Sequence, residues 1–141
     1  MMFSILIITH GLLSQELKSS VEFVLGEKII RKIFAMSIDE DSRDYDTYSN
    51  KIANYLMENS NTIIFTDMFG GTPSNIGLAY FNKDSVEIIS GVNLPMLIKI
   101  SSLRGECNLK DLIRVSQESG RKYMNVASAF FGESESCKKK D

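Results

Sequence analysis

Apolar runs and stretches of helical periodicity alternate along the chain. Several short runs are almost entirely apolar, which is typical of strands buried on both faces of a sheet. They cover residues 3–9, 29–38, 62–66 and 86–90. Between and after them, apolar residues recur at intervals of three and four, which predicts amphipathic helices. The predicted helical faces include Leu13, Leu17, Val21 and Val24, then Tyr45, Tyr48, Ile52, Tyr55 and Leu56, and finally Leu109, Leu112 and Ile113.

The order of these elements predicts an α/β fold. Strands that alternate with helices form a mostly parallel sheet with helices on both faces, and right-handed crossovers make it open and doubly wound. We expect four parallel strands, and the run at 126–132 predicts a further, antiparallel strand at an edge. One domain is expected over residues 1–131, followed by a flexible charged tail over 132–141. Asp41 or Ser42 is a candidate N-cap of the second helix.

Composition narrows the functional classes. The 16 basic and 18 acidic side chains are interspersed and give a net charge of −2, so the clustered basic face that binds nucleic acid is not expected. Cys107 and Cys137 lie far apart, which argues against a disulfide framework and suits a reducing cytoplasm. The first apolar run is too short to span a bilayer, so we expect a cytoplasmic protein without direct membrane insertion.

Polar residues with distinctive chemistry follow the predicted strands. His10, the only histidine, ends the first run, Asp67 follows the third, and residues 91–93 follow the fourth. Parallel strands share a direction, so these loops meet at the carboxyl edge of the sheet, where ligands bind in such folds. His10 and Asp67 are therefore expected to be neighbours.

The loop after Asp67 has the features of an anion site. Gly70 and Gly71 allow the backbone to approach a ligand closely, Thr72 is a good N-cap, and Pro73 suits the first helical position. The amides and the dipole of a helix N-terminus attract negative charge. The G-K-[ST] ending of a Walker A loop is missing. An ordinary glycine-rich turn before a capped helix explains the same residues equally well.

His10 is either a structural residue or a nucleophile. Asp67 can accept a hydrogen bond from one ring nitrogen, which fixes the tautomer and leaves the other nitrogen with its lone pair outward. A carboxylate also stabilises the positive ring that forms when the nitrogen attacks. Beside an anion site, this pair indicates phosphoryl transfer, which depends mainly on positioning and electrostatic support. One histidine cannot build a zinc site, and no acidic cluster suggests Mg²⁺, so we expect a carrier with neither metal nor cofactor.

Four motifs resemble those of the IIA component of the mannose-type (mannose/fructose/sorbose) family of the bacterial phosphoenolpyruvate-dependent sugar phosphotransferase system. They are THG at 9–11, TDMFGGTPSN at 66–75, GVNLPML at 91–97 and ESGR at 118–121, in the family's order and spacing. The resemblance implies a phosphotransferase with an open α/β fold. It also implies a homodimer whose C-terminal strand can pass between subunits.

The resemblance assigns roles to single residues. His10 would accept a phosphoryl group on Nε2 from the phosphohistidine of HPr and pass it to a IIB component of a sugar permease during sugar uptake. Asp67 would orient His10, and Thr72 stands where the family commonly has a hydroxyl near the phosphate. Phe69 replaces a frequent tryptophan and Ser74 a larger apolar residue, and both are expected at the rim of the site. Side chains that either dock partners or pack locally are Leu12, Met68 and Phe69.

Other functions fit parts of the same pattern. A regulatory phosphocarrier without its own transporter, or the phosphodonor subunit of a dihydroxyacetone kinase, would use the same chemistry. A receiver-like signalling domain would use Asp67 as acceptor, but it needs acidic Mg²⁺ ligands after the first strand, where this chain has THG. A flavodoxin-type module would need a hydroxyl-rich loop there. A plain interaction domain would fit if His10 and Asp67 lay apart.

Overall fold

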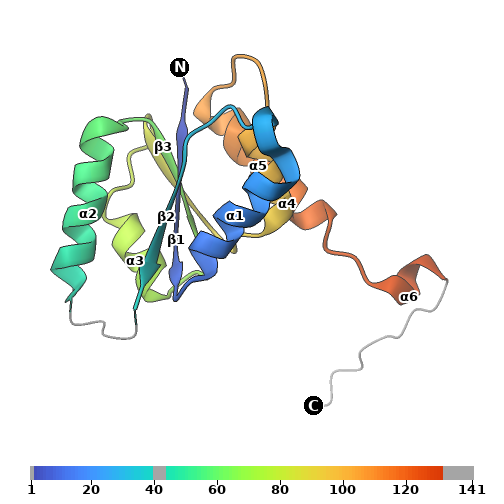
Figure 1. Cartoon of the computed structure of the whole chain (residues 1–141), viewed down its shortest axis with the longest axis horizontal. Coiled ribbons are helices and arrows are strands. Elements are labelled where there is room, and N and C mark those ends of the chain that lie inside the picture. The colour runs from blue at the N-terminus through green and yellow to red at the C-terminus, as the bar shows by residue number, and fades with distance from the viewer. Residues whose placement is uncertain (1, 40–43, 132–141) are drawn as a thin grey trace, which may run out of the picture.

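The fold is a parallel sheet between two layers of helices. The computed structural model describes residues 2–39 and 44–131. The strands are β1 (Ser4–His10), β2 (Ile33–Ile38), β3 (Thr62–Thr66) and β4 (Val86–Ser90). The helices are α1 (Leu13–Leu25), the 3₁₀ helix η1 (Gly26–Lys28), α2 (Tyr45–Glu58), α3 (Thr72–Leu78), α4 (Leu94–Ser102), α5 (Leu109–Lys122) and α6 (Ala127–Phe130). In Figure 1, α2 and α3 lie on one side of the sheet and α1, α4 and α5 on the other.

The sheet has the order β2-β1-β3-β4, and all of its paired strands are parallel. Strand β1 therefore pairs with β2 on one side and with β3 on the other, so the direction of winding reverses at β1. In open α/β sheets the crevice for ligands forms at such a switch point, beyond the carboxyl ends of the strands. His10 is the last residue of β1, which places it at this point.

Alternation along β1 explains why its sequence is apolar without interruption. Ile5 and Ile7 belong to the core beneath α1, α4 and α5, whereas Leu6 and Ile8 belong to the core beneath α2 and α3. All four side chains are at most 2% exposed. Continuing this alternation, His10 falls on the α3 side of the sheet, where the chain meets solvent.

The motifs at 91–97 and 118–121 contact each other and connect α4 to α5. The Asn93 side chain caps α4 by accepting a hydrogen bond from the Met96 amide at 3.2 Å, and it donates one to the Gly120 carbonyl at 3.1 Å. A Cβ atom on Gly120 would lie 3.1 Å from Asn93 Nδ2 and 2.5 Å from the end of the Met96 side chain. Asn93 and Gly120 therefore hold the two helices together.

The predicted boundaries are confirmed for β3 and β4, but other segments differ. Strand β2 begins at Ile33 instead of residue 29, because the backbone of Ile30 bonds to Ser101 at the end of α4 and not to β1. The prediction of a strand over 126–132 is wrong within the described residues: α6 forms there, with nearly all of its side chains exposed. An isolated strand has no partner for its backbone groups, whereas this short helix bonds to itself.

Some predictions from the sequence concern residues outside the part of the chain that the structure describes. These are the N-cap at Asp41 or Ser42 and the tail over 132–141. Within the described part of the chain, every helix is too short or too polar to cross a membrane.

Candidate functional site

His10 and Asp67 meet at the carboxyl edge of the sheet, as the parallel topology predicts. The ring Nδ1 of His10 lies 2.7 Å from Asp67 Oδ2, and the backbone N–H of His10 donates to the same oxygen at 2.9 Å. The other oxygen, Oδ1, accepts from the Met68 amide at 2.9 Å. Both carboxylate oxygens are therefore held by hydrogen-bond donors, which fixes Asp67 relative to the end of β1.

The surroundings of Asp67 keep it ionised. Partial burial raises the pKa of its carboxyl group, but the hydrogen bonds and charge of His10, together with the Met68 amide, outweigh burial and lower the pKa below its ordinary value. An ionised carboxylate can only accept hydrogen bonds. The ring proton of a neutral His10 therefore sits on Nδ1, and Nε2 keeps its lone pair.

The ring of His10 is accessible on the side that Asp67 leaves free. The His10 side chain is 52% exposed and that of Asp67 is 13% exposed. Gly11 follows with φ +52°, a left-handed conformation that favours glycine, and its N–H donates to the Ile38 carbonyl at 2.9 Å. The chain thus turns away immediately after His10 and leaves the side chain half exposed to solvent.

Gly71 packs against the same ring. A Cβ atom on Gly71 would stand 3.0 Å from His10 Cε1 and 3.7 Å from Nε2. Gly70 precedes it with φ +83°, so the loop needs glycine there for a conformational reason. Of the two residues, Gly71 therefore lies next to the His10 ring, while Gly70 shapes the turn that brings it there.

Thr72 does not cap α3 as predicted. Gly71 occupies the N-cap position, Thr72 is the first helical residue, and no side-chain capping hydrogen bond forms. The backbone of Gly71 is extended, and the helix begins at Thr72, one residue earlier than the Thr-Pro pattern indicates. Thr72 remains half-buried beside Gly71, at the start of the helix that faces His10.

The candidate docking side chains surround this edge and are open to solvent. Leu12 is 63%, Met68 57% and Phe69 78% exposed. Ser74, by contrast, is wrongly predicted to lie at the rim: its side chain is completely buried beneath the loop.

Sequence reasoning missed a cluster of hydroxyl groups under the site. Thr66 Oγ1 lies 2.9 Å and Ser74 Oγ 3.2 Å from Ser90 Oγ. Thr66 and Ser90 are the polar last residues of two adjacent apolar strands, and they are paired in register. Their shared position at the ends of neighbouring strands is the sequence signal that could have identified this cluster.

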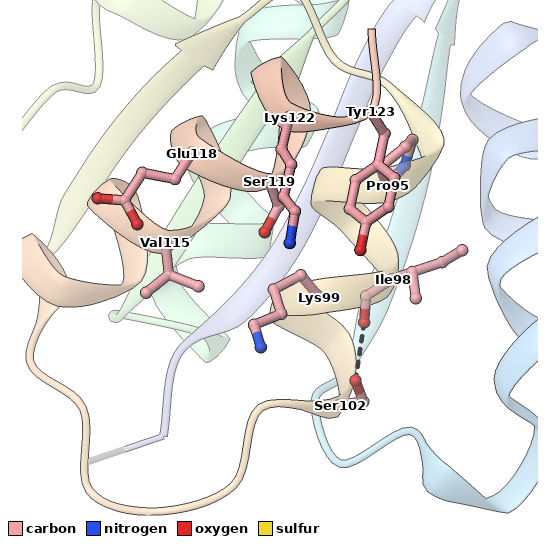
Figure 2. A pocket seen from close by; sticks show the side chains of 9 residues that line it. All are labelled: Pro95, Ile98, Lys99, Ser102, Val115, Glu118, Ser119, Lys122 and Tyr123. Atoms are coloured by element: carbon pink, nitrogen blue, oxygen red, sulfur yellow. Dashed lines mark hydrogen bonds between the residues drawn. The ribbon is translucent and has the colours of Figure 1, made fainter. Parts of the chain in front are cut away.

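Another cavity lies apart from this edge. An open cavity of about 600 Å³ lies between α4 and α5, and in its lining the Ser102 hydroxyl donates to the Ile98 carbonyl at 2.9 Å. Figure 2 shows the side chains that line this cavity. Its lining combines both charges and shares no residue with the His10 cluster: Pro95, Ile98, Lys99, Ser102, Val115, Glu118, Ser119, Lys122 and Tyr123. Within the described chain, no three His, Cys, Asp or Glu side chains gather as a metal site would require.

Fold and site together define an open parallel α/β protein with a carboxylate-oriented histidine at its topological switch point. The sequence model of the family described as "PTS system fructose IIA component" matches residues 4–117. The chain therefore belongs to this family, the IIA components of the mannose/fructose type of the phosphotransferase system. IIA components are phosphotransferases that work with HPr and IIB partners.

Individual relatives agree with this assignment. The PTS system fructose-specific EIIA component of Bacillus subtilis (strain 168) is 27% identical over 128 residues, which cover 90% of this chain and 88% of that protein. The PTS system mannose-specific EIIAB component of Escherichia coli (strain K12) is 26% identical over 92% of this chain, which spans only 41% of that protein. The crystal structure of phosphotransferase system component EIIA from Streptococcus agalactiae shares the fold, with a TM-score of 0.80 at 21% identity over 91% of this chain and 99% of that one.

Proposed function

We propose that the protein carries a phosphoryl group on His10 Nε2, taking it from the phosphohistidine of HPr and passing it to a IIB component during sugar uptake. The observation that carries the proposal is the 2.7 Å contact between His10 Nδ1 and Asp67 Oδ2. It supports a proton on Nδ1 and a lone pair on Nε2, which would act as the nucleophile on a side chain that is 52% exposed. A regulatory phosphocarrier or a dihydroxyacetone kinase subunit would use the same step and differ only in its acceptor.

The chemistry is a symmetric exchange between imidazole rings. The lone pair of Nε2 attacks phosphorus and forms a P–N bond as the P–N bond of phospho-HPr breaks, and the imidazole of HPr leaves with that electron pair. His10 now carries both the phosphoryl group on Nε2 and the proton on Nδ1, so its ring is positive. The ionised Asp67 stabilises this positive ring. The stabilisation assists both the transfer of the phosphoryl group to His10 and its transfer from His10.

The phosphoryl oxygens need support of their own. We assign this role to Gly70, Gly71 and Thr72, whose backbone lies at the start of α3 beside the ring. The missing Cβ of Gly71 leaves space within 4 Å of Nε2. Thr72 is the first residue of α3, and its hydroxyl would donate to a phosphoryl oxygen. Docking of HPr and the IIB component would use the exposed apolar side chains Leu12, Met68 and Phe69.

We also propose that the functional unit is a homodimer. Strand β4 is an edge strand, and a groove of about 490 Å³ runs beside it, with Phe69, Leu78 and Met124 among its lining residues. The segment after α5 exposes a series of large apolar side chains: Tyr123, Met124, Val126, Phe130 and Phe131. An open sheet edge and an unpartnered apolar segment can cover each other between two copies of the chain.

A reconstituted relay tests the proposed function. Radiolabelled phosphoenolpyruvate, Enzyme I and HPr should place label on the wild-type chain, and a purified IIB component added later should remove it. Label that reaches the chain but stays there with every IIB component would favour a regulatory role. Label that never passes beyond HPr would contradict the proposal.

A further inference from the structure

A single hydroxyl group connects the two ends of the loop that carries Asp67. Thr66 directly precedes the loop and Ser74 follows it in the first turn of α3. Both hydroxyls lie within hydrogen-bond distance of Ser90 Oγ, Thr66 at 2.9 Å and Ser74 at 3.2 Å. Ser90 is the last residue of β4 and the register partner of Thr66. Loop and edge strand are thus joined at one atom.

The two partners of Ser90 are more buried than Ser90 itself. The side chains of Thr66 and Ser74 are completely buried, whereas Ser90 is partly buried and lines the groove beside β4. A hydroxyl has one donor and two acceptor sites, which lets Ser90 Oγ serve both neighbours at once. Removing it takes this partner from two buried hydroxyls, an outcome that costs more than losing a solvent-exposed bond.

The ends of the loop determine where its functional residues stand. Asp67 is adjacent to Thr66 and contacts His10 Nδ1, while Gly71 lies near Ser74 and so close to the ring that a Cβ atom on it would stand 3.0 Å from Cε1. We propose that Ser90 is a positioning residue for phosphoryl transfer, whose hydroxyl holds both ends of the loop and thereby sets Asp67 and Gly71 against the His10 ring. This inference rests on the proposed function.

Variants of Ser90 separate positioning from ordinary core packing. Ser90→Ala removes the junction, and Ser90→Thr keeps the hydroxyl. Ser116→Ala is the control, because it removes a serine hydroxyl that bonds within α5, to the Leu112 carbonyl at 2.8 Å, and Ser116 is even more buried than Ser90. Initial rates of transfer from phospho-HPr, divided by the folded fraction, should fall about tenfold or more in Ser90→Ala, because small displacements of catalytic groups are costly. Ser90→Thr and Ser116→Ala should keep the wild-type rate.

A double-mutant cycle tests the shared junction directly. Ser74→Ala alone should slow transfer less than Ser90→Ala, since Thr66 retains its partner. Added to Ser90→Ala, it should change the rate little, because the bond it removes is already lost. Equal rates for Ser90→Ala and Ser116→Ala, or fully independent effects of Ser74 and Ser90, would overturn the inference. Ser74→Ala also serves if Ser90→Ala does not fold, and a wild-type rate for it would then overturn the inference.

Amide hydrogen exchange provides a readout that needs no phosphoryl transfer. In Ser90→Ala, exchange should accelerate over residues 67–72 and stay at the wild-type level in α5. Unchanged exchange over 67–72 would show that Ser90 does not hold the loop. A wild-type chain that accepts no phosphoryl group overturns the proposed function and the role in transfer, whereas the exchange data decide separately whether the junction exists.

Discussion

Gly71 leaves no room for a side chain beside His10: a Cβ atom there would stand 3.0 Å from the ring Cε1. Real Cβ contacts are rarely so short, so either the ring or the loop must move when a methyl group is added. The movement would displace Nε2 from the start of α3 and disturb its alignment with Asp67. Gly71 has no side chain, but it is expected to control the position of His10 Nε2.

Gly71→Ala should slow phosphoryl transfer to His10 by about tenfold to a hundredfold, because the nucleophile is misplaced by a fraction of an ångström or more. Gly77→Ala is the matched control. A Cβ on Gly77 would make only ordinary contacts, the nearest at 3.5 Å from Ile64 Cγ2, and alanine is the better helix former by up to about 1 kcal/mol. Gly77→Ala should therefore transfer at the wild-type rate and unfold at a slightly higher urea concentration. Wild-type transfer by Gly71→Ala would show that the contact does not matter.

Asp67→Asn should abolish most of the activity while leaving the fold in place. The neutral asparagine cannot stabilise a positive ring. An amide nitrogen in place of Oδ2 would face the His10 backbone N–H, and where it donates to Nδ1 it holds the ring proton on Nε2 and removes the nucleophilic lone pair. A carboxylate-to-amide change beside a catalytic histidine costs about 10⁴-fold in a serine protease, and we expect a loss of at least about 10²-fold here. Rates of transfer from phospho-HPr measure the effect. Asp84→Asn, an exposed aspartate away from His10, is the control and should transfer normally.

Asp67 should also make the free energy of unfolding depend on pH in the acid range. Its folded-state pKa is lowered, so the stabilisation it provides is present above its unfolded pKa of about 3.9 and is lost as the pH falls through the lower folded value. Urea unfolding of wild type and Asp67→Asn should therefore differ most near neutral pH and converge as the pH falls through the lowered folded-state pKa. A difference that grows on acidification would contradict this linkage.

The homodimer depends on the segment after α5. A chain that ends at Lys122 lacks the exposed apolar residues from Tyr123 to Phe131 and should be a monomer, whereas the full chain should sediment as a dimer. Tyr45, which is exposed on α2 away from β4, offers a control: Tyr45→Ser should leave the dimer intact. A monomeric full chain, or a dimeric truncated one, would exclude this mode of association.

Patterns of apolar residues in the sequence predict the structural elements whose side chains are buried in the core. The run that became β3 is buried at every position, and β4 buries Val86 and Ile89, so apolar residues mark both strands in the sequence. The meeting of His10 and Asp67 follows from parallel strand direction alone. The start of α3 and the burial of Ser74 depend on the conformation of the glycine pair, which sequence does not reveal.

The bond from the His10 backbone to Asp67 likewise depends on local backbone direction, which no spacing rule predicts. The prediction for the C-terminal segment is wrong for a different reason. A strand over 126–132 needs a neighbouring strand for its backbone groups, and the chain's own sheet does not approach it. Residues 127–130 therefore fold on themselves, although their apolar side chains have the pattern of a strand.

Intact-mass measurement after incubation with phosphoenolpyruvate, Enzyme I and HPr tests the central proposal most directly. Wild type should gain the mass of one phosphoryl group, and acid should remove it, because a P–N bond on imidazole is labile to acid. His10→Ala should gain nothing, and Asp67→Ala should gain the group slowly. An adduct that persists in His10→Ala, or a wild-type chain that stays unmodified with its cognate HPr, would contradict phosphoryl transfer through His10.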